Sequence, residues 1–220
     1  MGLATYWIST SNALVSLGLK GCRLTSVQIR DAQVSDIPLL AYVCLQATGG
    51  IFEALYQGSI PGRETSHIVE HLFSRLNATS SYRNCQIFEA KGEAVGGLHG
   101  YPFDASAQDP GDPLARADRF HLVRPFVELP PPSGSYYVSS VGFYSNQRGR
   151  GYGRQLMQEA EAIARTKALN SMSLHVFERN SPAVTLYKSM GYEALGRQPV
   201  VTHPLIRYDG QLLLMGKSLD

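Results

Sequence analysis

The chain has 220 residues, of which 44% are hydrophobic and 17% charged, and its 20 Lys and Arg against 18 Asp and Glu give a formal charge of +2. This composition excludes a disordered or polyelectrolyte protein, and the length predicts one large domain, since domains usually hold ~100–200 residues. No run of five or six like charges forms an arm for nucleic acid or a patch for anionic lipid. We therefore expect neither a nucleic-acid partner nor a membrane partner.

Residues 1–25 form an N-terminal extension whose structure the pattern leaves open. Its first 19 residues carry no charged side chain, but Thr, Ser and Asn interrupt each apolar run and no basic segment precedes them. We read neither an export signal nor a membrane span here. The three cysteines, Cys22, Cys44 and Cys85, are widely spaced and include no C-x-x-C pair. This predicts buried thiols in a reducing, cytoplasmic compartment rather than a disulfide framework or a zinc site.

From residue 26 to residue 220 short strands alternate with helices, which predicts one domain over this span. Ser35 and Asp36 offer a cap for the first helix, and a short turn at 91–93 joins two strands into a hairpin. The elements expected in the first half are a strand over 27–30, a helix from 37 to the glycine pair at 49–50, a helix over 67–76, and strands over 86–90 and 94–99.

Residues 101–134 form a long connection that seven prolines keep irregular, with a short helix expected near 114–122. Loops of this length more often take part in binding or catalysis than serve only to connect two elements. The alternative is that the segment is disordered. Its two ends are tied to strands of the sheet. We therefore expect this connection to shape the binding of an acceptor molecule.

The second half has the clearest pattern, with strands over 136–143 and 171–177 and a helix that begins after a glycine-rich turn. Another helix has Ser181 as its N-cap, Pro182 at its first position and Gly191 past its end. Strands over 192–195 and 211–217 complete the chain. For the helix after the turn, the spacing places Leu156, Ala160, Ile163, Ala164 and Lys167 on the apolar face and Glu159, Glu161 and Arg165 on the solvated side.

The glycine-rich turn at 147–153 joins a strand to a helix. Such a turn presents backbone N–H groups at the positive end of a helix dipole, which predicts a site for phosphate or pyrophosphate. Arg148, Arg150 and Arg154 can add charge-assisted hydrogen bonds. A P-loop would require Lys and then Ser or Thr after the last glycine, and a dinucleotide fingerprint would require glycine at position 154. The sequence meets neither requirement.

Two motifs occur in order: Val141-Gly142-Phe143 followed by Arg148-x-x-Gly151-x-Gly153, and then Asn180-x-x-Ala183-x-x-x-Tyr187-x-x-x-Gly191-Tyr192. Together they resemble the acetyl-CoA-binding core of the GNAT superfamily of N-acetyltransferases, over about residues 136–195. The resemblance implies an α/β (mixed α+β) single domain, with a central, mostly antiparallel twisted sheet flanked by helices and strands splayed at the cofactor site. It implies acetyl-CoA as cosubstrate and the cofactor-binding residues Val141, Gly142, Phe143, Arg148, Gly149, Arg150, Gly151, Tyr152, Gly153, Arg154, Asn180 and Ala183.

The resemblance places Tyr187 at the thioester sulfur as the catalytic acid. Attack of an amine on a thioester expels a thiolate, which benefits from a proton donor. Tyr187 follows Asn180 by seven residues, about two helical turns, so both side chains lie on one helix face. The alternative is a core aromatic packed with Val184 and Met190.

The general base is not evident, because Val138-Ser139-Ser140 stands where family members often carry a carboxylate. The open candidates are a water chain through Ser139 or Ser140, or one of Glu53, Glu89, His99 and His203. No cluster of His, Cys and Asp has the spacing of a metal site.

The sequence thus predicts an enzyme that moves acetyl from acetyl-CoA to a primary amine, on a small molecule or a peptide, by direct attack on the thioester. A non-catalytic sensor or interaction module that binds CoA or another nucleotide is the alternative, since a phosphate turn alone guarantees no turnover. Which amine is acetylated is not readable, and a homodimer is left open.

Overall fold

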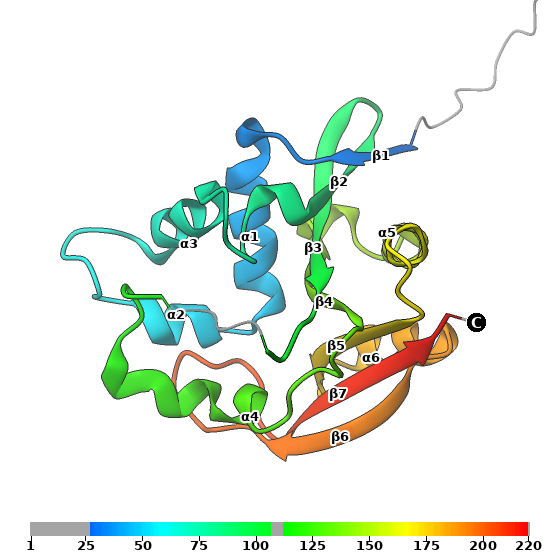
Figure 1. Cartoon of the computed structure of the whole chain (residues 1–220). Coiled ribbons are helices and arrows are strands. Elements are labelled where there is room, and N and C mark those ends of the chain that lie inside the picture. Colours follow the sequence, from blue (N-terminus) through cyan, green and yellow to red (C-terminus); the bar gives the residue numbers. More distant parts are fainter. Residues whose placement is uncertain (1–26, 107–111, 220) are drawn as a thin grey trace, which may run out of the picture.

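The structure of the chain, a computed structural model, describes residues 27–106 and 112–219 (Figure 1). The N-terminal extension at 1–25, with Cys22, lies outside the described residues. Cys44 and Cys85 are buried, as expected. Among the described residues, no helix has the length and hydropathy to cross a membrane.

Seven strands form one open sheet in the order β1-β2-β3-β4-β5-β7-β6. Neighbouring strands are antiparallel except β4 and β5, which are parallel. The expected hairpin of β2 and β3 is therefore confirmed, and β1, β2, β3 and β4 form an antiparallel meander. The strands are β1 (Val27–Asp31), β2 (Cys85–Ala90), β3 (Glu93–Pro102), β4 (Tyr136–Phe143), β5 (Ser171–Phe177), β6 (Glu193–Pro199) and β7 (Gln211–Ser218).

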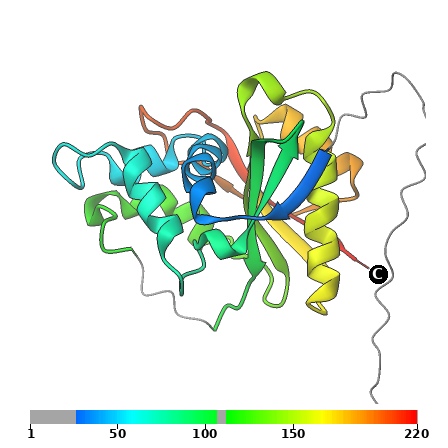
Figure 2. The ribbon, with the colours of Figure 1, turned by 90° about the horizontal axis from the view of Figure 1, so that it is seen from above.

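Helices cover both faces of the sheet, with α1, α2 and α3 on one side and α5 on the other (Figure 2). The helices expected from residue 37, over 67–76, after the glycine-rich turn and after Asn180 are present, and α2 is an addition that the sequence pattern did not predict. In place of the helix expected near 114–122, the chain forms a 3-10 segment, Ala117–Val123, that leads into α4. The helices are α1 (Ile37–Ala47), α2 (Ile51–Tyr56), α3 (Thr65–Ser74), α4 (Arg124–Val127), α5 (Tyr152–Thr166) and α6 (Ser181–Ser189).

The core has two layers, one on each face of the sheet. Leu156 and Met157 of α5 pack with Phe88 and Leu98 of the sheet. On the opposite face, α1 and α3 pack on β2, with Leu40 and the other members of this cluster fully or nearly fully buried. The amphipathic pattern of α5 and the apolar length of α1 thus place the two helices on opposite faces of the sheet.

Two details of the α5 prediction were wrong. Glu161 is buried rather than solvated, because it accepts a 2.7 Å hydrogen bond and ion pair from Lys217 Nζ of β7. Lys167, expected on the apolar face, is exposed at the end of the helix. Helical spacing finds the centre of an apolar face, but a long-range partner decides whether a charge at its border is buried.

The boundaries of α6 and β6 also differ from the prediction. Ser181 is the first residue of α6, and its N-cap is Asn180, whose carbonyl oxygen accepts a 3.0 Å hydrogen bond from the N–H of Val184. Strand β6 begins at Glu193 and continues to Pro199 because it pairs with β7 along its length. Pairing with a distant strand, rather than local propensity, sets its end.

Candidate functional site

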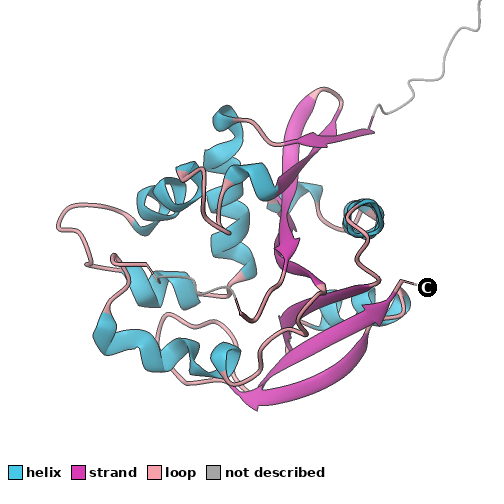
Figure 3. Cartoon of the chain, in the orientation of Figure 1, coloured by secondary structure: helices cyan, strands magenta, loops and turns pink. Residues whose placement is uncertain are grey.

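Strands β4 and β5 separate from each other part-way along the sheet. Their pairing covers only Tyr136–Val138 against Met172–Leu174, although β4 continues to Phe143 and β5 to Phe177. Beyond this point β5, β7 and β6 run at an angle to β2, β3 and β4 (Figure 3). The expected splayed strands are therefore present, and the peptide groups of β4 after Val138 have no ladder partner on the β5 side.

Strand β4 also contains a bulge at the point of separation. His99 pairs with Ser140 and Gly100 pairs with Val138, so Ser139 has no partner on β3. A bulge of this kind bends a strand and redirects one residue out of the regular alternation. The backbone of Ser139 therefore lies in neither ladder and is available to a bound molecule.

A cleft of about 70 Å³ occupies the gap between the two strands. Its walls include Ser139 and Val141 of β4 and Asn180, Ala183 and Tyr187 at the start of and along α6. The structure thus brings together both motifs found in the sequence, one from each side of the separation.

Tyr187 is buried, and burial raises the pKa of its hydroxyl to about 12. Its ring lies 5.8 Å, between centroids, from the ring of Tyr192. A hydroxyl with this pKa keeps its proton throughout the neutral range, which is the state that a proton donor requires. The placement therefore fits the acid role, and the same burial also fits the alternative of a core aromatic.

The glycine-rich turn lies at the N-terminus of α5. Gly149 and Gly151 have φ values of +76° and +79°, and Gly151 is the N-cap of the helix. A Cβ at either position would meet nothing within 4 Å, so positive φ rather than crowding accounts for the glycines. No side chain caps this helix, and the N–H of Arg154 donates to the carbonyl of Gly151 at 3.2 Å, so the N–H groups of Tyr152 and Gly153 are those that the helix start leaves without an intrahelical partner. A phosphate group fits this arrangement.

The arginine side chains at the turn are exposed, whereas the aromatic rings next to them pack on the sheet. Arg148 and Arg150 are exposed, whereas Arg154 donates from Nη2 to Ser189 Oγ of α6 at 2.6 Å. Tyr152 and Phe143 pack their rings on Phe88 at centroid distances of 4.6 and 5.3 Å. These two residues can therefore offer only backbone groups to a ligand, as can Gly142 and Gly153.

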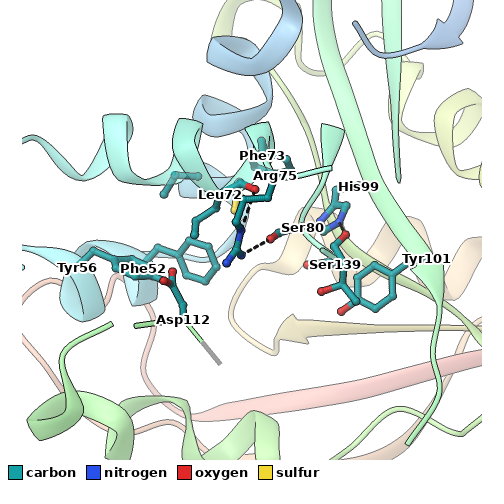
Figure 4. A pocket seen from close by; sticks show the side chains of 13 residues that line it. Phe52, Tyr56, Leu72, Phe73, Arg75, Ser80, His99, Tyr101, Asp112 and Ser139 are labelled. Atoms are coloured by element: carbon teal, nitrogen blue, oxygen red, sulfur yellow. Dashed lines mark hydrogen bonds between the residues drawn. The ribbon is translucent and has the colours of Figure 1, made fainter. Parts of the chain in front are cut away.

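A second cavity, of about 200 Å³, lies on the α1–α3 face of the sheet (Figure 4). It shares Ser139 with the cleft between β4 and β5, so the bulge borders both spaces. The cavity is mainly apolar and aromatic. Its walls come from α1, α2, α3, β3, β4 and the two loops at 75–80 and 112, through Cys44, Phe52, Tyr56, Val69, Leu72, Phe73, Arg75, Thr79, Ser80, His99, Tyr101, Asp112 and Ser139.

Of the candidate bases, only His99 and Ser139 line this cavity. Glu89 is paired with Arg30 at 2.7 Å, Glu53 borders a different groove, and the Nδ1 of His203 accepts the N–H of Leu205 at 3.2 Å. His99 donates from Nε2 to the carbonyl of Thr79 at 2.7 Å, and burial lowers its pKa to about 4. His99 is therefore neutral at physiological pH and a weak proton acceptor.

The described residues of the connection, 101–106 and 112–134, include several that are bonded to the rest of the molecule. Tyr56 donates to Asp112 Oδ2 at 2.7 Å, and Arg119 Nη1 donates to the carbonyl of Ala54 at 2.6 Å. His175 of β5 donates from Nε2 to the carbonyl of Leu129 at 2.8 Å and accepts the hydroxyl of Tyr137 at Nδ1, 3.0 Å away. These bonds hold the connection against α2 and β5, next to the second cavity.

The sequence pattern did not identify Phe52, Tyr56, Phe73 and Arg75 of this cavity, whereas Tyr101 and Asp112 belong to the connection that was expected to shape acceptor binding. None of them belongs to a spaced motif, and α2, which carries two of them, was not predicted. They become neighbours only when α2, α3 and the connection pack together.

Residues 52–192 of the chain match the model of the acetyltransferase (GNAT) family, and this is more than half of the 220 residues. The chain belongs to the GNAT family. Over 62 residues it is 32% identical to the uncharacterized N-acetyltransferase YycN of Bacillus subtilis, a stretch that is 28% of this chain and 40% of that protein. It is also 41% identical over 61 residues to mycothiol acetyltransferase of Thermobispora bispora, covering 28% of this chain and 20% of that protein.

The fold of this GNAT protein is found in solved structures. YncA of Salmonella typhimurium, solved with its cofactor acetyl-CoA, has a TM-score of 0.55 at 17% identity, covering 89% of this chain and 95% of that chain. A crystal structure of another acetyltransferase has a TM-score of 0.62 at 17% identity, covering 88% of this chain and 100% of that chain. The predicted GNAT fold is therefore confirmed, and acetyl-CoA is the acetyl donor of the family.

Proposed function

We propose that this GNAT protein transfers the acetyl group of acetyl-CoA to a primary amine that enters from the second cavity. The observation that carries the proposal is the separation of β4 and β5, lined by Asn180 and Tyr187, with Ser139 in the wall of both the cleft and the second cavity. A cofactor in the cleft and an acceptor in the cavity would meet at Ser139. A module that only binds a phosphate group does not require a second cavity beside the cleft between β4 and β5.

Acetyl-CoA supplies an activated acetyl thioester. We assign its pyrophosphate to the turn Arg148–Arg154, its pantetheine arm to Val141–Phe143, Asn180 and Ala183, and its thioester to the cleft between Ser139 and Tyr187. The N–H groups of β4 that lack a ladder partner can then donate to the carbonyl oxygen, on which negative charge develops during acetyl transfer. These assignments extend the sequence resemblance with the geometry of the cleft.

Tyr187 Oη would donate its proton to the departing sulfur. On the acceptor side, a primary amine has a reference pKa near ~10.4 and must lose a proton before or during attack. His99 is neutral but too weak a base to remove that proton efficiently, because its pKa is about 4. We therefore assign proton removal to a chain of water molecules aligned by the hydroxyl of Ser139, which would carry the proton from the amine to bulk solvent, in line with the water chain considered from the sequence.

A coupled experiment tests the function. Calorimetric titration with CoA measures cofactor binding, and a free-thiol assay with acetyl-CoA and a panel of amines measures turnover. We expect binding and amine-dependent release of thiol. CoA binding without thiol release by any amine supports the sensor alternative, and absence of CoA binding contradicts the site. A cytoplasmic location remains a prediction, tested by fractionation, and homodimer formation is tested by sedimentation.

A further inference from the structure

The second cavity is small. Its volume of about 200 Å³ lies below the roughly 300–1,000 Å³ of pockets for drug-sized ligands, so its occupant has few non-hydrogen atoms. Phe52, Tyr56 and Leu72 form an apolar wall on the α2–α3 side, opposite Ser139, His99 and Tyr101 of the sheet (Figure 4). The ring of Phe73 lies against that of His99, with 5.4 Å between the centroids. An acceptor must reach Ser139 with its amine while its body packs on the apolar wall.

Arg75 extends into this cavity from the end of α3 (Figure 4). Its guanidinium donates to two neutral oxygens, Ser80 Oγ at 2.8 Å from Nη2 and the carbonyl of Leu72 at 3.4 Å from Nε. No carboxylate of residues 27–106 and 112–219 forms an ion pair with it. The half-buried cation therefore has N–H groups left for an anionic ligand, and the planar fork of arginine fits a carboxylate.

The other polar groups of the cavity do not supply that anion. Asp112 is already bonded, since its Oδ2 accepts the hydroxyl of Tyr56 at 2.7 Å and its Oδ1 accepts the N–H of Leu114 at 3.0 Å. His99 is neutral, with its Nε2 bonded to the carbonyl of Thr79. Among the residues that line the cavity Arg75 is the cation and Asp112 the anion, and the guanidinium opposes the binding of a second ammonium group beside it.

We propose that the acceptor is a small amine that carries its own carboxylate, an amino acid with an apolar body, and that Arg75 binds this carboxylate. The inference rests on the proposed function and names the substrate class of the same site. The carboxylate anchors the molecule at Arg75, the apolar body packs against Phe52 and Leu72, and the amine faces Ser139. Starting from the neutral amine, the reaction forms an amide N–C bond and breaks the thioester C–S bond. The amine loses one proton to solvent, Tyr187 gives its proton to the sulfur, and Tyr187 then regains a proton from solvent.

The test compares acceptors that differ only in the carboxylate. The pairs are phenylalanine with phenethylamine, leucine with isoamylamine, and 6-aminohexanoate with pentylamine, with spermidine as a polycation. For the wild-type protein we expect kcat/KM to be roughly 10- to 100-fold higher for the acid of at least one pair, the range for hydrogen bonds to a charged group. Spermidine should be a poor acceptor.

Arg75→Gln removes the charge and retains a donor for Ser80. We expect it to lower kcat/KM for the preferred acid roughly 10- to 100-fold, mainly through KM, with little change for the matched amine or in acetyl-CoA binding. Arg83→Gln, on an exposed arginine outside the cavity, is the matched control and should change neither value.

The outcomes separate the inference from the function on which it rests. Equal or faster turnover of the amines that lack a carboxylate, or of spermidine or a peptide N-terminus alone, overturns the inference and leaves acetyl transfer intact. The same holds if Arg75→Gln lowers acid and amine turnover equally. Failure to bind acetyl-CoA, or to acetylate any amine, overturns both. The wild-type comparison decides the question even if Arg75→Gln does not fold.

Discussion

The cofactor side and the acceptor side of this protein are built in different ways. The cofactor side uses two short segments, the strand and turn at 136–154 and the start of α6, in which local motifs place each functional group. The acceptor side uses residues from Cys44 to Ser139, brought together by packing of α1, α2, α3, the sheet and the connection. A motif can therefore reveal the donor of the reaction, whereas the acceptor depends on long-range contacts.

Tyr187→Phe gives the largest expected effect, on the cofactor side. The ring still packs but the proton donor is lost, so we expect kcat to fall ~10²–10⁴-fold with acetyl-CoA affinity unchanged. Steady-state kinetics and calorimetry measure the two quantities. Tyr192→Phe is the matched control, because its ring is a buried neighbour that does not line the cleft. Near wild-type kcat in Tyr187→Phe would leave this residue with only its packing role.

Acidification tests two histidines, His99 in the second cavity and the half-buried His175 in the cleft between β4 and β5. Burial lowers the pKa of His99 and of His175 to about 4, below the ~6.5 of an unfolded histidine. Between these values the unfolded chain binds more protons, so the free energy of unfolding falls as the pH drops from about 6.5 to about 4. Each histidine accounts for a loss of at most roughly 3 kcal/mol.

Urea unfolding at pH 7 and pH 4.5 measures this dependence. His175→Gln should lower the stability at pH 7 and flatten the dependence on pH, whereas His71→Gln, on an exposed histidine, should leave the slope unchanged. If His175→Gln leaves the pH dependence of the free energy of unfolding as steep as in the wild type, His175 is not a buried, neutral histidine.

Gly151→Val tests the phosphate turn on the cofactor side. Valine disfavours the φ of +79°, so the turn must change and acetyl-CoA affinity should fall about 10-fold or more. Gly62→Val imposes similar strain at φ +71°, also with open space around the Cβ, but far from this turn along the chain. Calorimetry should show weaker binding for the first variant only. Equal loss in both would point to general destabilisation.

Tyr56→Phe gives the smallest expected effect and concerns the acceptor side. It removes the hydrogen bond to Asp112, which is worth about 1 kcal/mol, so KM for the acceptor should rise a few-fold at unchanged acetyl-CoA affinity. Tyr42→Phe, whose ring packs on Tyr144 outside the cavity, serves as the control. If Tyr56→Phe changed the affinity for acetyl-CoA instead, cofactor binding and acceptor binding would not be independent of each other.

The sequence predicted the strands of the meander, β4, β5, and the helices α1, α3, α5 and α6, because apolar periodicity and turn residues act over a few positions. It did not predict α2, a six-residue helix with a glycine at its N-cap in place of Ser, Thr or Asp. Gly50 has a positive φ, and a Cβ there would lie 1.8 Å from the carbonyl oxygen of Leu205. The loop before β7 therefore fixes this glycine, and no local pattern records that approach.

What the sequence by itself determined is the family, the glycine-rich turn and the spacing from Asn180 to Tyr187, since each depends on backbone geometry within one or two turns of chain. Only the tertiary structure decided that Glu161 is buried beside Lys217, that Ser139 forms a bulge, and that Arg75 lies in a cavity with His99. These features arise from contacts between segments that are far apart in sequence. The energies that set them, desolvation and long-range pairing, depend on neighbours that a local pattern does not contain.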